Sequence, residues 1–343
     1  MQRDVPDRLM RMAHSCAEMG SPLYGALLAR AVQEYREGGP VKRVLDVDPE
    51  RPRIGLRLMA ALHYLALSGD EELAAHYPST GGDGDAAALW SVATGRFVRD
   101  AETIEALMER TVQTNEPARA MPLMAGYCWL AARFDLPLRV FEIGASAGLN
   151  LRWDAFAYDG GSWTYGGPSS LVLRNTITGG IPAHLNAVPV VAERRGCDLH
   201  PLDATSSVDR MELLSFVWPD QAERIERLRG ALTVAASLPV EVDRADLLDW
   251  IPRHAVPQDG ALTVVVETVL VEHLSVEMRR ALNDALHAQA AKATASAPFA
   301  WLRMEPKDGA YVTEILTWPD HRAEGVRIAT SDGHAQNIVW SGA

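Results

Sequence analysis

The first 136 residues carry hydrophobic and polar positions at helical spacing. Apolar side chains recur every three or four residues, first at Leu9, Met12, Ala13 and Cys16 and again at Leu58, Met59, Leu62 and Leu65. Residues at this spacing lie on one face of an α-helix, so the pattern predicts amphipathic helices. Strand-like alternation is not visible in this part of the sequence. We therefore expect residues 1–136 to form an all-helical N-terminal domain.

The pattern changes at Pro137, where short apolar runs begin to alternate with helical segments. This alternation is typical of a mainly parallel sheet covered by helices. The expected strands are Arg139–Ile143, Val188–Ala192 with an extension towards Cys197, Pro239–Val242, Leu262–Glu267 and Phe299–Met304. The expected helices are Ser146–Phe156, Met211–Ala235 with an interruption at Pro219, and Ser275–Lys292 with Ser275 as its cap. Residues 137–343 are thus expected to form a doubly wound α/β domain.

Two stretches depart from this alternation. Residues 159–189 contain Gly-Gly pairs and two strand-like triplets, Trp163–Tyr165 and Leu171–Leu173, which indicate an inserted β-hairpin or lid. After Met304 only six residues precede the next apolar run, too few for a parallel crossover. The C-terminal edge of the sheet is therefore expected to be an antiparallel meander, with strands at Tyr311–Thr317, Val326–Thr330 and His334–Trp340 and a hairpin turn at Asp332-Gly333.

Composition narrows the class of partner. The chain has 33 Lys and Arg against 45 Asp and Glu, a net charge of −12. A general phosphate-backbone binder needs a basic face, so a nucleic acid partner is not expected, although a local basic patch is compatible with this charge. The charged N-terminus has no continuous apolar signal segment, and the longest apolar run, Ala120–Ala132, is too short to span a bilayer, so no membrane partner is expected. The three cysteines lie far apart in sequence. We therefore expect a cytoplasmic protein with reduced thiols, no metal site and a small-molecule partner.

The run from Glu142 to Gly148 carries the main candidate chemistry, because a loop of very small residues follows a strand there. Gly144-x-Ser146-x-Gly148 matches the nucleophile elbow of an α/β-hydrolase, with Ser146 as the nucleophile. That reading also requires strands and an oxyanion loop upstream, where this sequence looks helical and shows no such loop. A nicotinamide-binding loop would need glycine where Ser146 and Leu149 stand. The hydrolase reading stays open as an alternative.

Read from Glu142, the same run resembles the first motif of class I S-adenosylmethionine-dependent methyltransferases. The resemblance implies a Rossmann-like methyltransferase fold for the second domain and S-adenosylmethionine as cofactor. Ligands of open α/β sheets bind at the carboxyl ends of the strands. The expected cofactor-binding residues are Glu142, Gly144, Ser146, Gly148, Asn150, Asp198 for the ribose, Asp246 and Leu247 for the adenine, and Thr268. Glu267 ends the fourth strand, His273 follows it, and these two residues are the candidate catalytic bases.

Each of these acids, taken alone, is more typical of a helix cap or a solvated loop than of a site, and His200, His273, Trp163 and Tyr165 are more typical of structural hydrogen bonds and packing. Their recurrence at successive strand ends is what favours a site. Three features depart from the methyltransferase pattern: Ser146 replaces the middle glycine, the connection between the first two strands is long, and no Asn-Pro-Pro-Tyr-like acceptor motif follows Thr268.

Nearly the whole chain also resembles a bacterial family classified only as a domain of unknown function. The shared phrases are Ser21–Tyr24, Thr114–Glu116, Glu142–Leu151, Cys197–Asp203 and Leu316–Pro319. The functional hypothesis is methyl transfer from S-adenosylmethionine to a small-molecule acceptor. The alternative is a non-catalytic protein that binds S-adenosylmethionine or S-adenosylhomocysteine.

Overall fold

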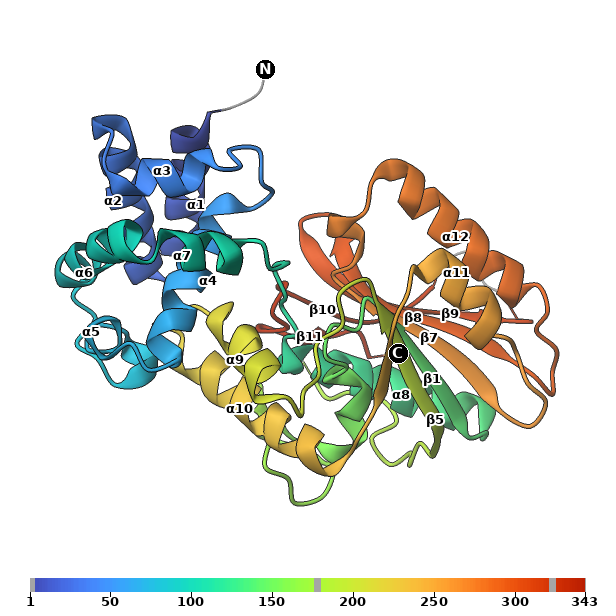
Figure 1. Cartoon of the computed structure of the whole chain (residues 1–343). Coiled ribbons are helices and arrows are strands. Elements are labelled where there is room, and N and C mark those ends of the chain that lie inside the picture. The colour runs from blue at the N-terminus through green and yellow to red at the C-terminus, as the bar shows by residue number, and fades with distance from the viewer. Residues whose placement is uncertain (1–3, 176–179, 321–324, 343) are drawn as a thin grey trace. The chain divides into compact units, whose positions relative to one another are not determined.

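The computed structural model describes residues 4–175, 180–320 and 325–342, which form two compact units (Figure 1). The first unit comprises Met1–Thr114 and Ser206–Leu228, and the second comprises Asn115–Thr205 and Arg229–Ala343. Residues 1–3 of the expected N-terminal domain and residues 176–179 of the expected insertion lie outside the described residues. Across the described ranges, no helix has both the length and the apolar character needed to cross a membrane.

Helices build the first unit, as the periodicity predicts. They are α1 (Val5–Glu18), α2 (Pro22–Glu37), α3 (Pro40–Asp46), α4 (Ile54–Leu67), α5 (Glu71–Ala74), α6 (Ala86–Arg99) and α7 (Ala101–Met108), with a 3-10 turn η1 (Pro78–Thr80). Proline stands in the first turn of α1, α2 and α3, where its missing N–H needs no partner. Asp70 and Asp85 cap α5 and α6 with their carboxylates. Between residues 4 and 114 the structure describes no strand.

A segment from the second half of the chain completes this helical unit. It contains α9 (Ser207–Ser215) and the start of α10 (Ala222–Ser237), separated near Pro219 as expected. The Asp220 carboxylate accepts hydrogen bonds from the Ser21 hydroxyl at 2.6 Å and the Leu23 amide at 3.0 Å. Trp218 is buried in the same apolar cluster as α1, α2 and α4. The segment is therefore held by both polar and apolar contacts.

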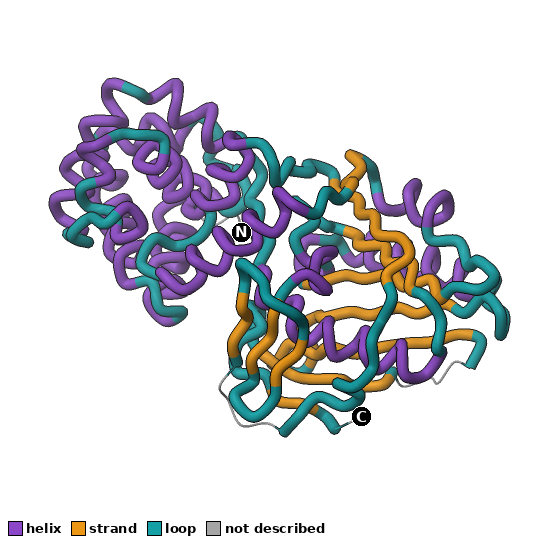
Figure 2. Tube along the Cα trace, turned by 90° about the horizontal axis from the view of Figure 1, so that it is seen from below, coloured by secondary structure: helices purple, strands orange, loops and turns teal. Residues whose placement is uncertain are grey.

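The second unit is built on an eight-stranded sheet in the order β11-β10-β9-β8-β7-β1-β5-β6 (Figure 2). Five strands are parallel: β6 (Glu241–Arg244), β5 (Val191–Asp198), β1 (Leu138–Ile143), β7 (Leu262–Thr268) and β8 (Phe299–Lys307). All five lie at or within a few residues of the positions predicted from their apolar runs. The expectation of an α/β unit with a mostly parallel sheet is confirmed.

The remaining strands form the expected antiparallel edge. β9 (Ala310–Trp318) pairs with β8, β10 (Val326–Ser331) pairs with β9, and β11 (Val339–Trp340) pairs with β10. The last strand is shorter than the predicted His334–Trp340. The Asp332 carboxylate accepts hydrogen bonds from the His334 and Gln336 amides, both at 2.9 Å, which folds this stretch into a turn before pairing resumes.

Helices cover both faces of this sheet. On one face lies α8 (Ala120–Phe134), where a Cβ built on Gly126 would come within 2.7 Å of Leu302 Cδ1. On the other face, Trp301 belongs to an apolar cluster with residues of α11 (Leu247–His254) and α12 (Val276–Ala290). Successive residues of a strand point to opposite faces, so Leu302 and Trp301 identify the two layers. Ser275 caps α12 through the Met278 amide, as expected.

The expected helix over Ser146–Phe156 is wrong. The structure has only a short 3-10 segment there, η3 (Asn150–Ala155), and Phe156 is already extended. The chain continues directly into β2 (Ala157–Asp159), which pairs antiparallel with β3 (Thr164–Tyr165) and parallel with β4 (Val172–Arg174). Tertiary pairing in this small sheet overrides the helical periodicity. The insertion is thus a three-stranded sheet rather than a hairpin alone.

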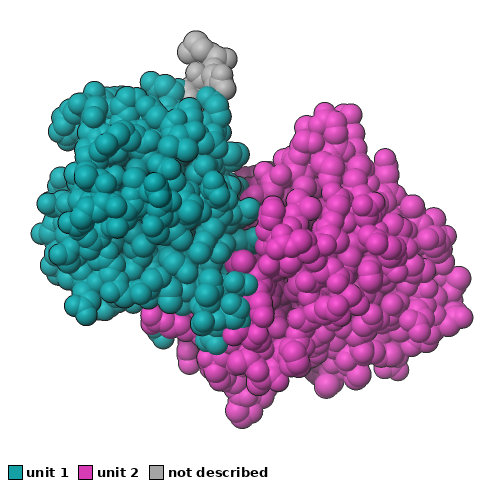
Figure 3. All heavy atoms as spheres, viewed as in Figure 1, with its two compact units in different colours: residues 1–114, 206–228 teal, residues 115–205, 229–343 magenta. Residues whose placement is uncertain are grey.

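The two compact units divide the chain differently from the expected ranges 1–136 and 137–343 (Figure 3). Residues 115–136, with α8 and the 3-10 turn η2 (Pro117–Arg119), belong to the sheet unit. Residues 206–228 belong to the helical unit. Amphipathic periodicity shows that α8 is a helix with a buried face, but it does not show which partner covers that face.

Candidate functional site

The carboxyl ends of the parallel strands collect most of the polar residues singled out in the sequence. From β1 the chain crosses to β5 and β6 on one side, then returns to β7 and β8 on the other. Such a change of direction leaves a crevice outside the strand ends, here between β1 and β7. Glu142 lies at the end of β1 and Glu267 at the end of β7, so both flank this point.

The bend after β1 is tightly folded. Gly144, Ser146 and Gly148 have φ angles of 66°, 55° and 64°, in the left-handed region that favours glycine. A Cβ at position 144 would come within 2.8 Å of Leu270 Cδ1, and one at position 148 within 2.9 Å of Val242 Cγ2. Both glycines are therefore required by backbone conformation and by space. Ser146 adopts the same region with a side chain, which stores local strain.

The protein itself binds several amide groups of this bend. The Ala145 amide donates to the Cys197 carbonyl at 3.0 Å, and the Leu149 amide donates to the Asn115 side-chain oxygen at 3.0 Å. The Ser146 amide donates to Asp198 Oδ2 at 2.9 Å. Asn115 is part of the Thr114–Glu116 phrase, which the family resemblance led us to expect near the cleft. Only the 3-10 segment η3 follows the bend, so no α-helix N-terminus is available there for an anionic group.

Several polar side chains around the bend are buried without a hydrogen bond. Glu142 Oε2, Ser146 Oγ and both amide atoms of Asn150 have no partner among the described residues, and each of these residues is at most 5% exposed. Buried polar atoms are nearly always paired in native proteins, so each exception needs an explanation. Ser146 Oγ in particular contacts no base, which leaves the hydrolase reading without its required hydrogen bond.

Two arginines that sequence analysis missed surround Glu142. Arg152 is buried, and its guanidinium donates to the Gly148 carbonyl at 2.7 Å and the Leu238 carbonyl at 2.7 Å, which fixes the exit of the bend. Arg119 is also buried and donates to the Gly333 carbonyl at 3.0 Å. Burial raises the pKa of Glu142 to about 8, although Arg119 and Arg152 both lower it. The only sequence signal for these arginines was their position: Arg119 lies three residues after the Thr114–Glu116 phrase, and Arg152 directly follows Leu151.

Two of the expected cofactor-binding acids have structural partners. Asp198 accepts from the Ser146 amide and, through Oδ1, from the His200 amide at 2.9 Å. Asp246 is the N-cap of α11, and its Oδ1 accepts from the Leu248 amide at 2.8 Å. Leu247 is the first residue of that helix, and Thr268 ends β7 opposite Met304. The capping role of Asp246 is the ordinary one for an acid before a helix.

A second carboxylate accompanies Glu267. Glu267 is fully buried, and neither of its carboxylate oxygens has a hydrogen bond of normal geometry. Glu305, which sequence analysis missed, lies on the neighbouring strand and accepts from the Leu270 amide at 2.7 Å and the Val271 amide at 3.3 Å. Burial raises the pKa of Glu267 above its ordinary value, and the nearby Glu305 carboxylate raises it further. The two acids thus lie on adjacent strands, in surroundings that favour their protonated forms.

His273 and the lid aromatics have different surroundings from the buried acids. His273 is exposed in the 3-10 turn η4 (Val271–His273), beside Glu272, which accepts from the Tyr311 hydroxyl at 2.7 Å. Trp163 packs edge-on against Trp340 with ring centroids 5.9 Å apart. Tyr165 lies in β3, paired with Tyr158 of β2. No group of three His, Cys, Asp or Glu side chains suited to a metal ion occurs among the residues that the structure describes.

Comparison with known proteins gives one match. A family model described as an uncharacterised protein conserved in bacteria (DUF2332) matches residues 6–340. No match was found among curated proteins or among solved structures. Because the family model spans nearly the whole chain, from α1 to β11, the protein belongs to this bacterial family.

Proposed function

We propose that the protein binds S-adenosylmethionine at the bend after β1 and transfers its methyl group to a small-molecule acceptor. One observation carries the proposal: Glu142, Ser146 and Asn150 hold buried polar atoms without partners around a glycine bend at the topological switch point. Unpaired buried groups of this kind are expected where a polar ligand supplies the missing hydrogen bonds.

The residues fit the amino-acid part of such a ligand. An ammonium group is a donor of three hydrogen bonds, which the Glu142 carboxylate, the Ser146 hydroxyl and the Asn150 amide oxygen can accept. A cation beside Glu142 also favours its ionised form, and this offsets the cost of burying that charge. Only a short 3-10 segment follows the bend, so we assign the ligand carboxylate to Arg119, whose charge lowers the pKa of both Glu142 and Glu305.

The fit of the nucleoside part depends on Asp198. An ionised carboxylate has about four acceptor positions, and the Ser146 and His200 amides occupy two of them. Two positions therefore remain for ribose hydroxyls without loss of the existing contacts. Asp246 likewise uses one oxygen for its cap, so an adenine amine at its other oxygen is compatible with α11.

In the proposed methyl transfer, the protein's residues would position the acceptor and accept its proton. When bound, the sulfonium supplies an electrophilic methyl group. Residues of the crevice hold the acceptor in line and exclude water, and such alignment accounts for most of the rate in reactions of this kind. Glu267 is the best-placed proton acceptor, because its carboxylate oxygens are unpaired and its raised pKa suits a base. His273 is exposed and is the weaker candidate for this role.

Isothermal titration of the full chain with S-adenosylmethionine and S-adenosylhomocysteine tests the proposal. We expect binding to the wild type, strong loss in Glu142→Gln, and unchanged binding in Glu193→Gln, whose side chain is 43% exposed at the start of β5. Absence of binding by both nucleosides would contradict the proposal. Binding without transfer from labelled cofactor to amine, hydroxyl and thiol acceptors would favour the non-catalytic alternative. Labelling of Ser146 by a fluorophosphonate would instead support a hydrolase.

A further inference from the structure

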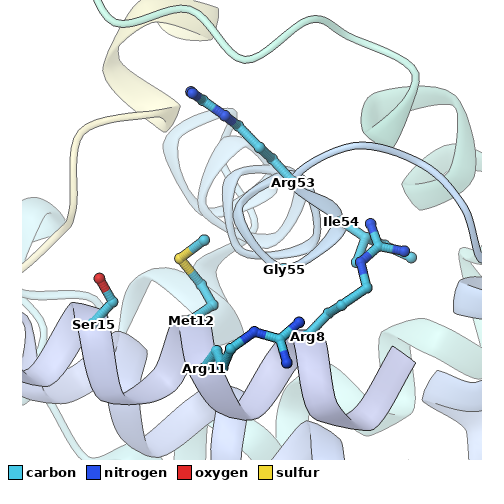
Figure 4. A pocket seen from close by; sticks show the side chains of 7 residues that line it. All are labelled: Arg8, Arg11, Met12, Ser15, Arg53, Ile54 and Gly55. Carbon is cyan, nitrogen blue, oxygen red and sulfur yellow. The ribbon is translucent and has the colours of Figure 1, made fainter. Parts of the chain in front are cut away.

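The helical unit contains a pocket of about 430 Å³ between α1 and the start of α4 (Figure 4). We propose that this pocket binds the phosphate group of a small phosphorylated molecule, a function independent of the site on the sheet. Its lining residues are Arg8, Arg11, Met12 and Ser15 of α1 with Arg53, Ile54 and Gly55 at the start of α4. Three of the seven are arginines, and none is acidic.

Charge is the first argument. The chain as a whole carries −12, so three guanidinium groups around one cavity are a local reversal of the protein's field. The side chains of Arg11 and Arg53 are exposed, and neither guanidinium has a hydrogen bond or ion pair with any described residue. Two cations without protein partners beside a cavity are free to bind an anion bidentately.

Arg8 has a different role in the pocket. Its guanidinium donates to the Pro49 carbonyl at 2.5 Å and also to the Arg51 carbonyl, and this fixes the chain that leads into α4. In Figure 4 the side chain of Arg8 extends from α1 towards Ile54, and Arg53 extends to the other side of the first turn of α4. The charges of Arg8 and Arg53 therefore flank that turn.

The backbone at this turn adds to the same field. Arg53 has a φ of 52°, a conformation that a non-glycine residue rarely adopts, and its side chain does not cap α4. The first turn of α4 also has no acidic residue. The positive end of a 14-residue helix therefore adds to the arginine charges at the pocket. A Cβ on Gly55 would come within 3.2 Å of Leu9 Cδ2, so glycine lets this turn approach α1 closely.

The neighbourhood remains positive beyond the lining. Arg51 and Arg57 lie beside the pocket, and Arg51 pairs with Asp48 at 3.2 Å. Arg57 donates to the Met108 and Glu109 carbonyls, both at 3.0 Å, rather than to an acid. Burial lowers the pKa of Arg57, and the nearby charges of Arg51 and Arg53 lower it further. An anion in the pocket would relieve this repulsion.

Size and shape indicate the class of ligand. A cavity of this volume accommodates a small molecule, and Met12 and Ile54 provide apolar surface beside the charges. Such a combination suits a phosphate monoester with an organic group. A nucleic acid backbone would require a longer basic stripe, which an acidic chain with one confined arginine cluster does not provide.

Titration calorimetry of the full chain with inorganic phosphate, phenyl phosphate and phenol tests the inference. We expect phenyl phosphate to bind more tightly than phosphate, phenol not to bind, and affinity to fall as salt is added. The double variant Arg11→Gln/Arg53→Gln should bind phenyl phosphate at least about tenfold more weakly. Both side chains are exposed and unpaired, so the variant should keep the wild-type circular dichroism spectrum and melting temperature.

The matched control is Arg30→Gln/Arg36→Gln on α2, which removes the same charge away from the pocket. Its affinity for phenyl phosphate should stay within about twofold of the wild type, since distant surface charges are screened. If both double variants bound phenyl phosphate equally weakly, the loss of affinity would come from the change in net charge alone, and the inference would be overturned. Absence of phosphate and phenyl phosphate binding would overturn it as well. Tighter binding of a single-stranded oligonucleotide than of phenyl phosphate would replace the small-molecule ligand by a nucleic acid.

Discussion

Replacing Glu142 by Gln should remove a pH-dependent loss of stability from the sheet unit. In the folded protein, burial raises the pKa of Glu142 from 4.5 to about 8, and Arg119 and Arg152 only partly offset this effect. The folded state thus keeps a proton that the unfolded chain has already lost. The contribution of Glu142 to the free energy of unfolding should therefore fall as pH rises from about 4.5 to about 8, and level off above that range. Gln is neutral at every pH and has nearly the same shape, so it removes this dependence.

The magnitude follows from the displacement of the pKa. At about 1.4 kcal/mol per pKa unit, a change from 4.5 to about 8 is on the order of 5 kcal/mol at pH 9. About 3 kcal/mol of this is already expressed at pH 7. Domains have total stabilities of roughly 5–15 kcal/mol, so a difference of this size is readily measured.

Urea unfolding at a series of pH values, followed by tryptophan fluorescence, measures this difference in the apo-protein. Glu314→Gln is a matched control with the opposite sign. Although burial raises the pKa of Glu314, Arg303 and Lys307 outweigh it and the net pKa is lowered. Its ion pairs therefore stabilise the fold above the unfolded pKa, and E314Q should be less stable than wild type at pH 7 and converge with it in acid. If the free energy of unfolding changed with pH equally in E142Q and wild type between pH 5 and pH 8, the inferred burial of an uncompensated carboxyl at Glu142 would be wrong.

Three further outcomes are expected. Gly148→Ala should lower the free energy of unfolding, measured by chemical denaturation, by about 1 kcal/mol or more beyond the effect of Gly309→Ala. Both glycines have a positive φ, but only a Cβ at position 148 meets a neighbour, Val242. Equal losses of stability in the two variants would point to backbone strain alone. Arg119→Met should raise the pKa of Glu142 further, because a neighbouring positive charge is lost. The free energy of unfolding should then fall more steeply with pH as pH 8 is approached. If its slope against pH stayed unchanged, Arg119 would have no electrostatic effect on Glu142. Cys16, Cys128 and Cys197 are buried, and burial raises the pKa of each thiol. At pH 8, Ellman's reagent should therefore react with these cysteines only after the protein is unfolded. Rapid labelling of the folded chain would contradict their burial.

The central strands β1, β7 and β8 could be predicted from sequence because each contains a short apolar run of strand length between turn or helical segments. β1, β7 and β8 begin or end within a few residues of the expected positions. The prediction of a helix at Ser146–Phe156 was wrong because it relied on apolar periodicity alone. Its apolar residues pack into a short 3-10 turn and the start of a small sheet, and periodicity alone does not reveal such pairing.

The positions of the polar residues along the sheet were predictable from the sequence, but their electrostatics were not. The order of strands and acids indicated which edge of the sheet would collect polar residues, and Glu142 and Glu267 do lie there. Whether an acid is paired depends on neighbours that are distant in sequence. Asp246 turned out to cap α11, and Arg119 and Glu305 became visible only once the chain was folded. Burial is a property of the assembled unit, so a single sequence cannot supply it.

The unpaired carboxyls are themselves the strongest argument that this edge serves a function. Glu142 shares its sheet face with Leu302 and α8, and Glu267 shares the opposite face with Trp301, so no direct pairing between them explains their burial. Each carboxyl lowers the stability of the fold unless it is neutral or meets a cation. Apolar side chains would pack in both places without this penalty. A fold that keeps two such groups at its topological switch point gives up stability there, and proteins make that exchange mainly where binding or catalysis requires it.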